Sequence, residues 1–281
     1  MSEKEIKIAG VVGDPISHSL SPKLHGYWLK KYGIKGDYTA FHVAANELAD
    51  FIDRLKKNNI KGVNITVPHK ENVLKLVDKV DDVAAKIGAV NTVYFDDDGN
   101  LLGTNTDGYG FLTHLKQSVK GWHSNKGPTV IIGAGGAARA VLMSLLDDGA
   151  PEIRITNRTL SRAQALATEV GDKRIKVIPW EEREKALKDA QLLVNVTTLG
   201  MTGQPALDLT LDQLPKQAVV YDIVYNPLET DLLKKAKERG NVTVDGLGML
   251  LHQAVPGFQA WFGIRPEVDD GLKHYLLKAI S

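Results

Sequence analysis

Several polar side chains follow one apolar run in a pattern that suits proton transfer on a small substrate. In residues 64–70 (NITVPHK), Asn64 and Thr66 alternate with apolar residues, so both lie on one face of a strand. They come near its carboxyl end, where α/β proteins place their sites. We expect Lys70 at the start of the next helix, where the positive end of the helix dipole disfavours a cation. Such a lysine is a candidate acid or base, and a solvated surface lysine is the alternative.

Other polar residues are candidates for holding a substrate. Ser17 and Ser19, two positions apart in an extended loop, would point their hydroxyls the same way and could bind a carboxylate or vicinal hydroxyls. The alternative is turn chemistry, in which serine hydroxyls bond nearby backbone. Asp107 precedes an apolar helical run and is expected either as a helix N-cap or as a functional carboxylate. Gln253 lies off the apolar stripe of its helix, as a solvent-facing residue also would.

A glycine-rich turn at residues 133–138 (GAGGAA) predicts a nucleotide site. It follows a β-branched strand, opens a helix and fits G-x-G-x-x-[GA] with Ala138 in the third place. Glycines let the backbone approach a pyrophosphate, and the helix N-terminus offers unpaired N–H groups. A tight strand-to-helix turn without a ligand is the alternative.

The end of the next strand favours NADP over NAD. NAD-binding units place an acidic residue about 20 positions after the first glycine, where it binds the ribose 2′-hydroxyl. Here Asn157, Arg158 and Thr159 follow the strand, and Asn157 is 157 − 133 = 24 positions after Gly133. Arg158, with Arg162 one helical turn later, could bind a 2′-phosphate through charge-assisted hydrogen bonds. The alternative is that Thr159 caps the helix while both arginines are solvated.

Alternating strands and helices must position these residues, and they predict an α/β fold. Strands are expected at 6–12, 38–43 and 62–67, with a hairpin of 90–95 and 100–104. Beyond the loop 121–128, strands at 129–132, 153–156, 192–196, 218–223 and 242–244 follow the order of a doubly wound domain. Two amphipathic helices close the chain, and they could cap this second sheet or return to the first domain.

Composition narrows the class of protein. With 281 residues, 43% of them hydrophobic and 25% charged, the chain suits two modest globular domains. A net charge of +1 gives no basic footprint for nucleic acid. The absence of cysteine excludes disulfides and zinc–thiolate sites, and no metal site is predicted elsewhere in the sequence. Residues 1–7 include several charged side chains, so we expect no signal peptide. The sequence has no long uncharged apolar stretch, so we expect no membrane span. We expect a cytoplasmic protein that acts on a small molecule.

An ordered set of short segments along nearly the whole chain resembles the shikimate dehydrogenase family. The segments are Ser17–Pro22, Gly62–Lys70, Gly88–Thr92, Asn105–Gly108, Gly133–Ala138, Asn157–Thr159, Tyr221–Pro227 and Asp245–Leu250. Each segment is short, but their joint order is highly specific.

The resemblance implies a fold and an activity. It implies a substrate domain with a mostly parallel sheet at 1–107 and 247–281, to which the C-terminal helices return, and a Rossmann-like NADP-binding domain at 108–246. The implied reaction is the reversible reduction of 3-dehydroshikimate to shikimate with NADPH, on the route to chorismate and aromatic amino acids. Lys70 would exchange a proton with the reacting oxygen, and Asp107 would orient Lys70 as its catalytic partner.

The same resemblance assigns the remaining site residues to two sets. The substrate set comprises Ser17 and Ser19 for a carboxylate, with Asn64, Thr66, Asn91, Tyr225 and Gln253 completing the polar lining. The cofactor set comprises Gly133, Ala134, Gly135, Gly136 and Ala137 at the pyrophosphate, Asn157, Arg158, Thr159 and Arg162 at the adenosine phosphate, Ile223 and Gly246 at the nicotinamide, and Asp82.

Two other functions compete with this reading. A quinate/shikimate dehydrogenase that also uses NAD would have similar pocket residues, although the charge of Arg158 has no target on NAD. An NADP-binding sensor without activity would keep the fold but would not need both Lys70 and Asp107. The sequence leaves a monomer and a homodimer open.

Overall fold

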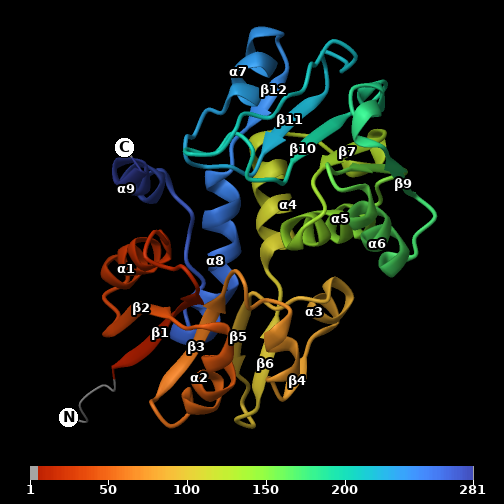
Figure 1. Cartoon of the computed structure of the whole chain (residues 1–281). Coiled ribbons are helices and arrows are strands. Elements are labelled where there is room, and N and C mark those ends of the chain that lie inside the picture. Colours follow the sequence, from red (N-terminus) through yellow and green to blue (C-terminus); the bar gives the residue numbers. More distant parts are fainter. Residues whose placement is uncertain (1–5, 281) are drawn as a thin grey trace. The chain divides into compact units, whose positions relative to one another are not determined.

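The computed structural model describes residues 6–280 (Figure 1). Residues 1–5, which include most of the charged start on which the signal-peptide prediction depends, lie outside the described residues, as does residue 281. The chain divides into two compact units. The first takes the chain up to Thr106 and again from Gln253, and the second runs from Asp107 to His252.

A mixed sheet with the strand order β2-β1-β3-β5-β6-β4 forms the base of the first unit. Its strands are β1 (Lys7–Gly13), β2 (Gly36–His42), β3 (Ile60–Ile65), β4 (Lys79–Val80), β5 (Thr92–Phe95) and β6 (Leu101–Thr104). Strand β1 pairs in parallel with β2 and β3, whereas β5 and β6 form the antiparallel hairpin that the Asp-Gly turn predicts. Strand β3 ends at Ile65, two residues earlier than predicted, and Val67 is exposed.

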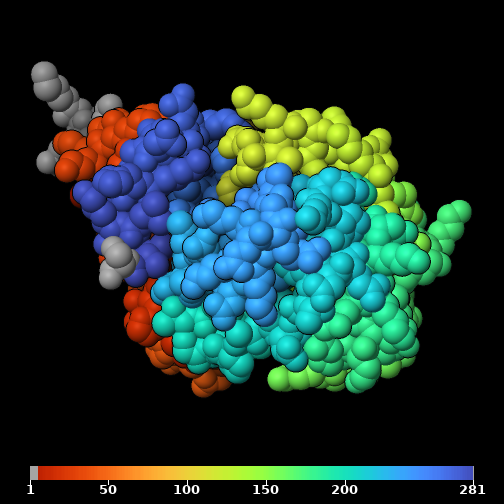
Figure 2. Space-filling model, turned by 90° about the horizontal axis from the view of Figure 1, so that it is seen from above, coloured from red at the N-terminus to blue at the C-terminus, as the bar shows by residue number. Residues whose placement is uncertain are grey.

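Helices from both ends of the chain pack on this sheet. They are α1 (Ser21–Lys31), α2 (Leu48–Arg54), α3 (Asp82–Ile87), α8 (Leu247–Phe262) from Gln253 onward and α9 (Asp270–Ile280), with the 3₁₀ helices η1 (Ala45–Glu47) and η2 (Asn72–Lys75). The Trp28 indole donates to the Glu267 carbonyl at 3.0 Å, and the Trp261 indole donates to the Val93 carbonyl at 2.9 Å. Figure 2 shows the dark-blue C-terminal segment against the red N-terminal segment. These contacts decide where the last helices pack: they return to the first unit.

The second unit has an all-parallel sheet in the order β12-β11-β10-β7-β8-β9. Its strands are β7 (Thr129–Ile132), β8 (Ile153–Thr156), β9 (Ile175–Ile178), β10 (Leu192–Asn195), β11 (Val219–Asp222) and β12 (Val242–Val244). Its helices are α4 (Asp107–Ser118), α5 (Gly136–Asp147), α6 (Leu160–Val170), α7 (Asp231–Glu238) and the start of α8, with η3 (Ser124–Lys126), η4 (Trp180–Glu182) and η5 (Lys185–Leu187). This is the doubly wound order, and that prediction is confirmed.

Alternation along β7 shows how the second sheet is buried on both sides. Ile131 packs into a cluster with α5 residues such as Val141, whereas Val130 and Ile132 face a separate cluster on the other side of the sheet. The neighbours β7 and β10 mark the point where the strand order reverses, so the loop after β7 lies at the switch point where such sheets bind ligands. Within residues 6–280, no helix has the length and apolar character needed to cross a membrane.

Candidate active site

Lys70 lies in a turn between β3 and η2, in the first unit. The prediction that it starts a helix is wrong, because the helical stretch begins only at Asn72 and is a four-residue 3₁₀ helix. Backbone hydrogen bonds fix this turn, one within the turn and one to a distant segment. The His69 N–H donates to the Thr66 carbonyl at 2.9 Å, and the Lys70 carbonyl accepts the Val90 N–H at 2.8 Å. The backbone of Lys70 is therefore fixed by the segment before β5, and a helix dipole does not govern its surroundings.

His69 anchors the same turn and has no direct access to solvent. Its side chain is fully buried, and its Nε2 donates to the Val43 carbonyl at 2.7 Å. Because a carbonyl only accepts, this bond fixes the proton on Nε2. His69 is a packing residue that holds the turn carrying Lys70.

Asn64 and Asn91 are buried beneath this turn with their amides engaged in the protein. Asn64 Oδ1 accepts the Tyr38 hydroxyl at 2.6 Å, and Asn64 Nδ2 donates to Thr92 Oγ1 at 3.0 Å. Asn91 Oδ1 accepts the Thr106 N–H at 2.9 Å. The structure thus brings two of the predicted substrate residues into one hydrogen-bonded group. Thr66 follows directly after β3 and is half-buried.

The two candidate serines differ in their surroundings. Ser19 Oγ accepts the Ser21 N–H at 3.3 Å, which is the turn chemistry given above as the alternative. Ser17 is exposed, and its side chain makes no hydrogen bond with any residue from 6 to 280. Helix α1 begins at Ser21 with Leu20 as its N-cap, so these serines lie in the approach to the helix. Of the two, Ser17 has the hydroxyl that is more open to a ligand.

Asp107, Tyr225 and Gln253 complete the predicted substrate set, on two different units. Gln253 belongs to the first unit, is half-buried, and accepts the Thr106 hydroxyl at its carbonyl at 2.8 Å. Asp107 is the buried first residue of α4 in the second unit, one place later than an N-cap. Tyr225 lies in the loop after β11, and burial raises the pKa of its hydroxyl.

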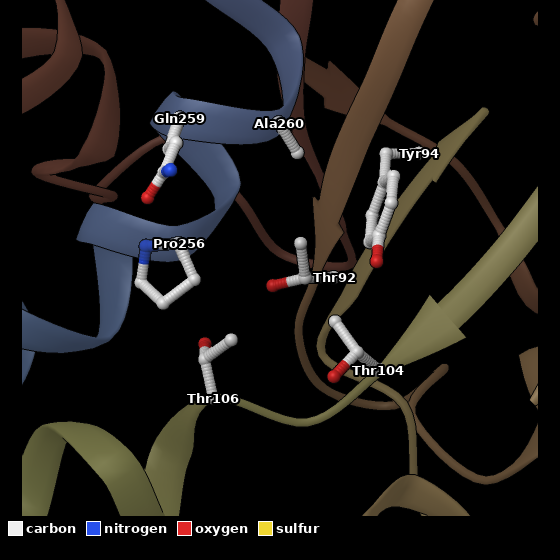
Figure 3. Close-up of a pocket in the computed structure, with 7 residues that line it drawn as sticks. All are labelled: Thr92, Tyr94, Thr104, Thr106, Pro256, Gln259 and Ala260. Carbon is white, nitrogen blue, oxygen red and sulfur yellow. The ribbon is translucent and has the colours of Figure 1, made fainter. Parts of the chain in front are cut away.

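A pocket of about 300 Å³ opens on the first unit between α8 and the β5–β6 hairpin (Figure 3). Its lining residues are Thr92, Tyr94, Thr104, Thr106, Pro256, Gln259 and Ala260. Thr92 and Thr106 are the two threonines that bond Asn64 and Asn91, so this pocket adjoins the buried amides. The sequence patterns did not predict this pocket. The available signal was a hairpin with threonine and tyrosine on one face, since Thr92 pairs with Thr104 across the strands.

The glycine-rich turn after β7 contains one glycine that the fold requires and two glycines that face open space. Gly133 has φ +120°, and a Cβ there would lie 2.9 Å from Thr197 Cγ2, so the fold itself requires glycine. At Gly135 and Gly136 a Cβ would meet no atom within 4 Å, and both residues are exposed. Helix α5 has no side-chain cap, so its first-turn N–H groups remain for a ligand. This cradle fits a pyrophosphate, with Ala134 and Ala137 half-buried beside the glycines.

Two arginines of the second unit differ from the rest. Arg158 and Arg162 are exposed and form no side-chain hydrogen bond or ion pair with the described residues. The other five arginines of the unit each pair with a carboxylate: Arg139 with Glu169, Arg154 with Glu152, Arg174 with Asp172, Arg183 with Asp208 and Arg239 with Asp212. Asn157 Nδ2 donates to the Thr159 carbonyl at 2.8 Å and so orders the loop before α6. Both arginines are therefore available to bind an anion beside this loop.

The fold itself accounts for some of the remaining cofactor candidates, which are Gly246, Ile223 and Asp82. Gly246 is required by the protein itself, because a Cβ would lie 2.0 Å from the Ile223 carbonyl oxygen. Ile223 is half-buried after β11. Asp82 is exposed at the start of α3 in the first unit, where the neighbouring Asp81 caps the helix by accepting the Ala84 N–H at 2.8 Å. As the acidic residue in the first turn of α3, Asp82 also lies where a carboxylate favours the positive end of the helix dipole.

Asp222, at the end of β11, is a buried carboxyl group that the sequence analysis did not single out. Burial raises its pKa to about 6, although Thr230, the Val224 N–H and Asn195 all donate to it. Among residues 6–280, no three His, Cys, Asp or Glu residues gather in a way that could hold a metal ion.

Sequence comparisons decide the family. The substrate binding domain of shikimate dehydrogenase matches residues 11–93, the shikimate/quinate 5-dehydrogenase domain matches 114–225, and the shikimate 5′-dehydrogenase C-terminal domain matches 246–273. The shikimate dehydrogenase (NADP(+)) of Dinoroseobacter shibae is 52% identical over 273 residues, which cover 97% of this chain and 98% of the relative. That of Paramagnetospirillum magneticum is 54% identical, over 96% and 98%. The chain belongs to the shikimate dehydrogenase family.

Solved structures of the shikimate dehydrogenase family share this fold. The shikimate 5-dehydrogenase from Thermus thermophilus, in complex with NADP(H) and shikimate, has a TM-score of 0.85 at 37% identity and covers 98% of this chain and 100% of that one. The quinate dehydrogenase from Corynebacterium glutamicum, in complex with NAD, has a TM-score of 0.89 at 31% identity, with coverage of 97% and 99%. The fold alone therefore does not separate shikimate from quinate.

Proposed function

We propose that this chain catalyses the reversible reduction of 3-dehydroshikimate to shikimate with NADPH, in the biosynthesis of chorismate and the aromatic amino acids. The observation that carries the proposal is the identity above 50% with shikimate dehydrogenases (NADP(+)) along nearly the whole chain. On this proposal the first unit binds the substrate and the second binds NADP.

We assign the proton transfer to Lys70, with Asp107 as its partner. Bound NADPH supplies the hydride to the carbonyl carbon of the substrate. The oxygen of that carbonyl gains negative charge as the hydride arrives and needs a proton donor within hydrogen-bond reach. Lys70 gives its proton to this oxygen and takes it back in the oxidation of shikimate. The turn that fixes the Lys70 backbone supports this assignment, because a donor must be held in place to act.

We assign the adenosine 2′-phosphate to Arg158 and Arg162. Their lack of carboxylate partners supports the assignment, since every other arginine of the second unit is paired. Asn157 and Thr159 shape the loop, residues 133–137 receive the pyrophosphate, and Ile223, Gly246 and Asp82 complete the cofactor set. For the substrate, Ser17 and Ser19 take the carboxylate, while Thr66, Asn64, Asn91, Tyr225 and Gln253 form the polar lining.

The second candidate is a quinate/shikimate dehydrogenase that also uses NAD, which the likeness to the quinate dehydrogenase favours. The test is absorbance of the reduced nicotinamide, with shikimate or quinate combined with NADP or NAD. Reduction with shikimate and NADP alone supports the first proposal. Equal rates with quinate or NAD support the second, and binding of NADPH without turnover in any combination supports a sensor.

Two expectations from the sequence stay predictions. We propose a cytoplasmic location, and sedimentation of the purified protein would decide between a monomer and a homodimer.

A further inference from the structure

Six polar groups in the first unit form a chain of hydrogen bonds that runs from β2 to α8. The side chains of Tyr38, Asn64, Thr92, Asn91 and Thr106 are buried, and the last acceptor is the Gln253 carbonyl. Each step is within hydrogen-bond distance: 2.6 Å from Tyr38 to Asn64, 3.0 Å from Asn64 to Thr92, 2.9 Å from Thr92 to Asn91, 3.0 Å from Asn91 to Thr106 and 2.8 Å from Thr106 to Gln253.

Backbone groups fix the orientation of both amides in this chain. Asn64 Nδ2 lies 3.3 Å from the Asn91 carbonyl, which can only accept, so this end of the Asn64 amide must be nitrogen. Asn91 Oδ1 lies 2.9 Å from the Thr106 N–H, which can only donate, so this end of the Asn91 amide must be oxygen. Neither amide can be flipped without placing two donors or two acceptors against each other.

The fixed amides and the nearest acceptors set the direction of the two threonine hydroxyls. Thr92 Oγ1 lies between a donor, Asn64 Nδ2, and an acceptor, Asn91 Oδ1, so it accepts from the first and donates to the second. Thr106 Oγ1 has two acceptors in reach, the Gln253 carbonyl at 2.8 Å and Asn91 Oδ1 at 3.2 Å. The carbonyl is the nearer one and takes the single proton, while the hydroxyl accepts from Asn91 Nδ2 at 3.0 Å. The chain therefore runs in one direction, and each bond polarises the next.

This arrangement determines what Asn91 can offer a ligand. The Thr92 hydroxyl and the Thr106 N–H occupy both lone pairs of Asn91 Oδ1. Any bond from this side chain to a substrate is then made by Nδ2 as a donor. The hydroxyl of Thr92 both receives the Asn64 amide and donates to Asn91 Oδ1.

We propose that Thr92 is a positioning residue that holds the Asn91 amide in its substrate-binding orientation through this one-way chain of hydrogen bonds. The role of Asn91 toward substrate rests on the proposed function. Thr92 itself is buried at the edge of the pocket, is bonded to both amides, and acts through Asn91. The strand pairing fixes the place of Thr92 beside Asn64, because Asn64, Thr92 and Thr104 lie in one row across β3, β5 and β6.

Steady-state kinetics of three variants test the proposal. Thr92→Val keeps the shape and removes the hydroxyl, which leaves Asn64 Nδ2 and Asn91 Oδ1 each short of a partner. We expect the KM for shikimate to rise about 10-fold or more while the KM for NADP changes less than about 2-fold. Thr92→Ser keeps the hydroxyl and should restore the KM for shikimate. Thr104→Val is the matched control, since Thr104 lines the same pocket but bonds Asp81 outside the chain, and it should leave both constants unchanged.

Hydrogen exchange of the Thr106 amide gives a readout that does not need activity. In Thr92→Val this amide should exchange about 10-fold faster than in the wild type, and in Thr104→Val it should not. An unchanged KM for shikimate and unchanged exchange in Thr92→Val, or equal losses in Thr92→Ser and Thr92→Val, would overturn the proposal. If Thr92→Val does not fold, Tyr38→Phe removes the first donor of the chain, and an unchanged rate of Thr106 exchange in that variant overturns it. If the wild type does not oxidise shikimate, the proposed function fails and the exchange data still decide the role of Thr92.

Discussion

One pair of candidate residues in the first unit and two pairs in the second have opposite surroundings. In the first, Asn64 and Asn91 are buried and bonded to neighbouring residues. In the second, Gly135 and Gly136 face open space and Arg158 and Arg162 have no carboxylate partners. A small polyhydroxylated substrate is distinguished by exact placement of donors, which requires a rigid network. A pyrophosphate and a phosphate need only accessible N–H groups and charge, which exposed loops supply.

The largest expected effect comes from Lys70. In Lys70→Ala, kcat for shikimate oxidation should fall by about 10²- to 10⁴-fold, because the reacting oxygen loses its proton partner. NADPH affinity, measured by quenching of protein fluorescence, should be nearly unchanged. Lys75→Ala, at the end of η2, is the control and should keep wild-type kcat. Wild-type turnover in Lys70→Ala would remove the acid/base assignment.

The second effect tests the unpaired arginines. Arg158→Ala should weaken NADPH binding by about 10- to 100-fold, because a charge-assisted contact to the 2′-phosphate is lost. NADH, which lacks that phosphate, should bind as it does to the wild type. The control is Lys176→Ala, which removes one exposed positive charge from β9. Equal weakening of both cofactors would show that Arg158 does not contact the 2′-phosphate.

The third effect separates the two kinds of glycine in the same turn. Gly135→Ala should weaken NADP binding about 10-fold and leave the melting temperature unchanged, since the new methyl group meets only space that a pyrophosphate would use. Gly133→Ala should instead lower the melting temperature, since its Cβ would press on Thr197 at a positive φ. Calorimetry with and without NADP measures both. A Gly135→Ala protein with wild-type affinity would contradict the cradle.

The smallest effect concerns stability alone. Because the folded-state pKa of Asp222, about 6, is above its unfolded value of 3.8, the group's stabilising contribution is present below pH 3.8 and is lost as the pH rises through about 6. Asp222→Asn should therefore gain stability over the wild type as the pH rises from about 4 to about 8, by up to about 3 kcal/mol in urea unfolding. The contrasting variant is Asp172→Asn. Arg174 lowers the pKa of Asp172 to about 2, so the loss of stability in that variant should not vary above about pH 5. A constant difference for Asp222→Asn over the same range would contradict the raised pKa.

Local patterns predicted the second unit better than the first. The bounds of β7, β8 and β12 match the residues expected from the sequence, because each is a short apolar run between turn residues. Strand β9 was missed, since Ile175–Ile178 is interrupted by Lys176 and is only half-buried. The glycine turn and the arginines could be proposed from the sequence because their chemistry is local.

The first unit depends on contacts between distant residues, which periodicity does not reveal. The backbone of Lys70 is held by its bond to Val90, and the role proposed for Thr92 rests on its pairing with Asn64, 28 residues away. The pocket at Thr92 arises only when α8 packs beside the hairpin. The roles assigned to the site residues and to the two domains stay predictions until the variants are measured.

The split sequence of the first unit has a consequence during synthesis on the ribosome. The second unit is continuous, so all of its strands have been synthesised once His252 has been made. The first unit cannot complete its packing until later, because the Trp261 indole donates to the Val93 carbonyl, 168 residues earlier in the chain. Until then His25, Trp28 and Tyr38 lack the cover of Phe258 and Trp261, against which their rings pack. The nascent chain thus holds an exposed aromatic surface until the residues from Gln253 onward arrive, and a chaperone that covers apolar surface would bind this N-terminal segment.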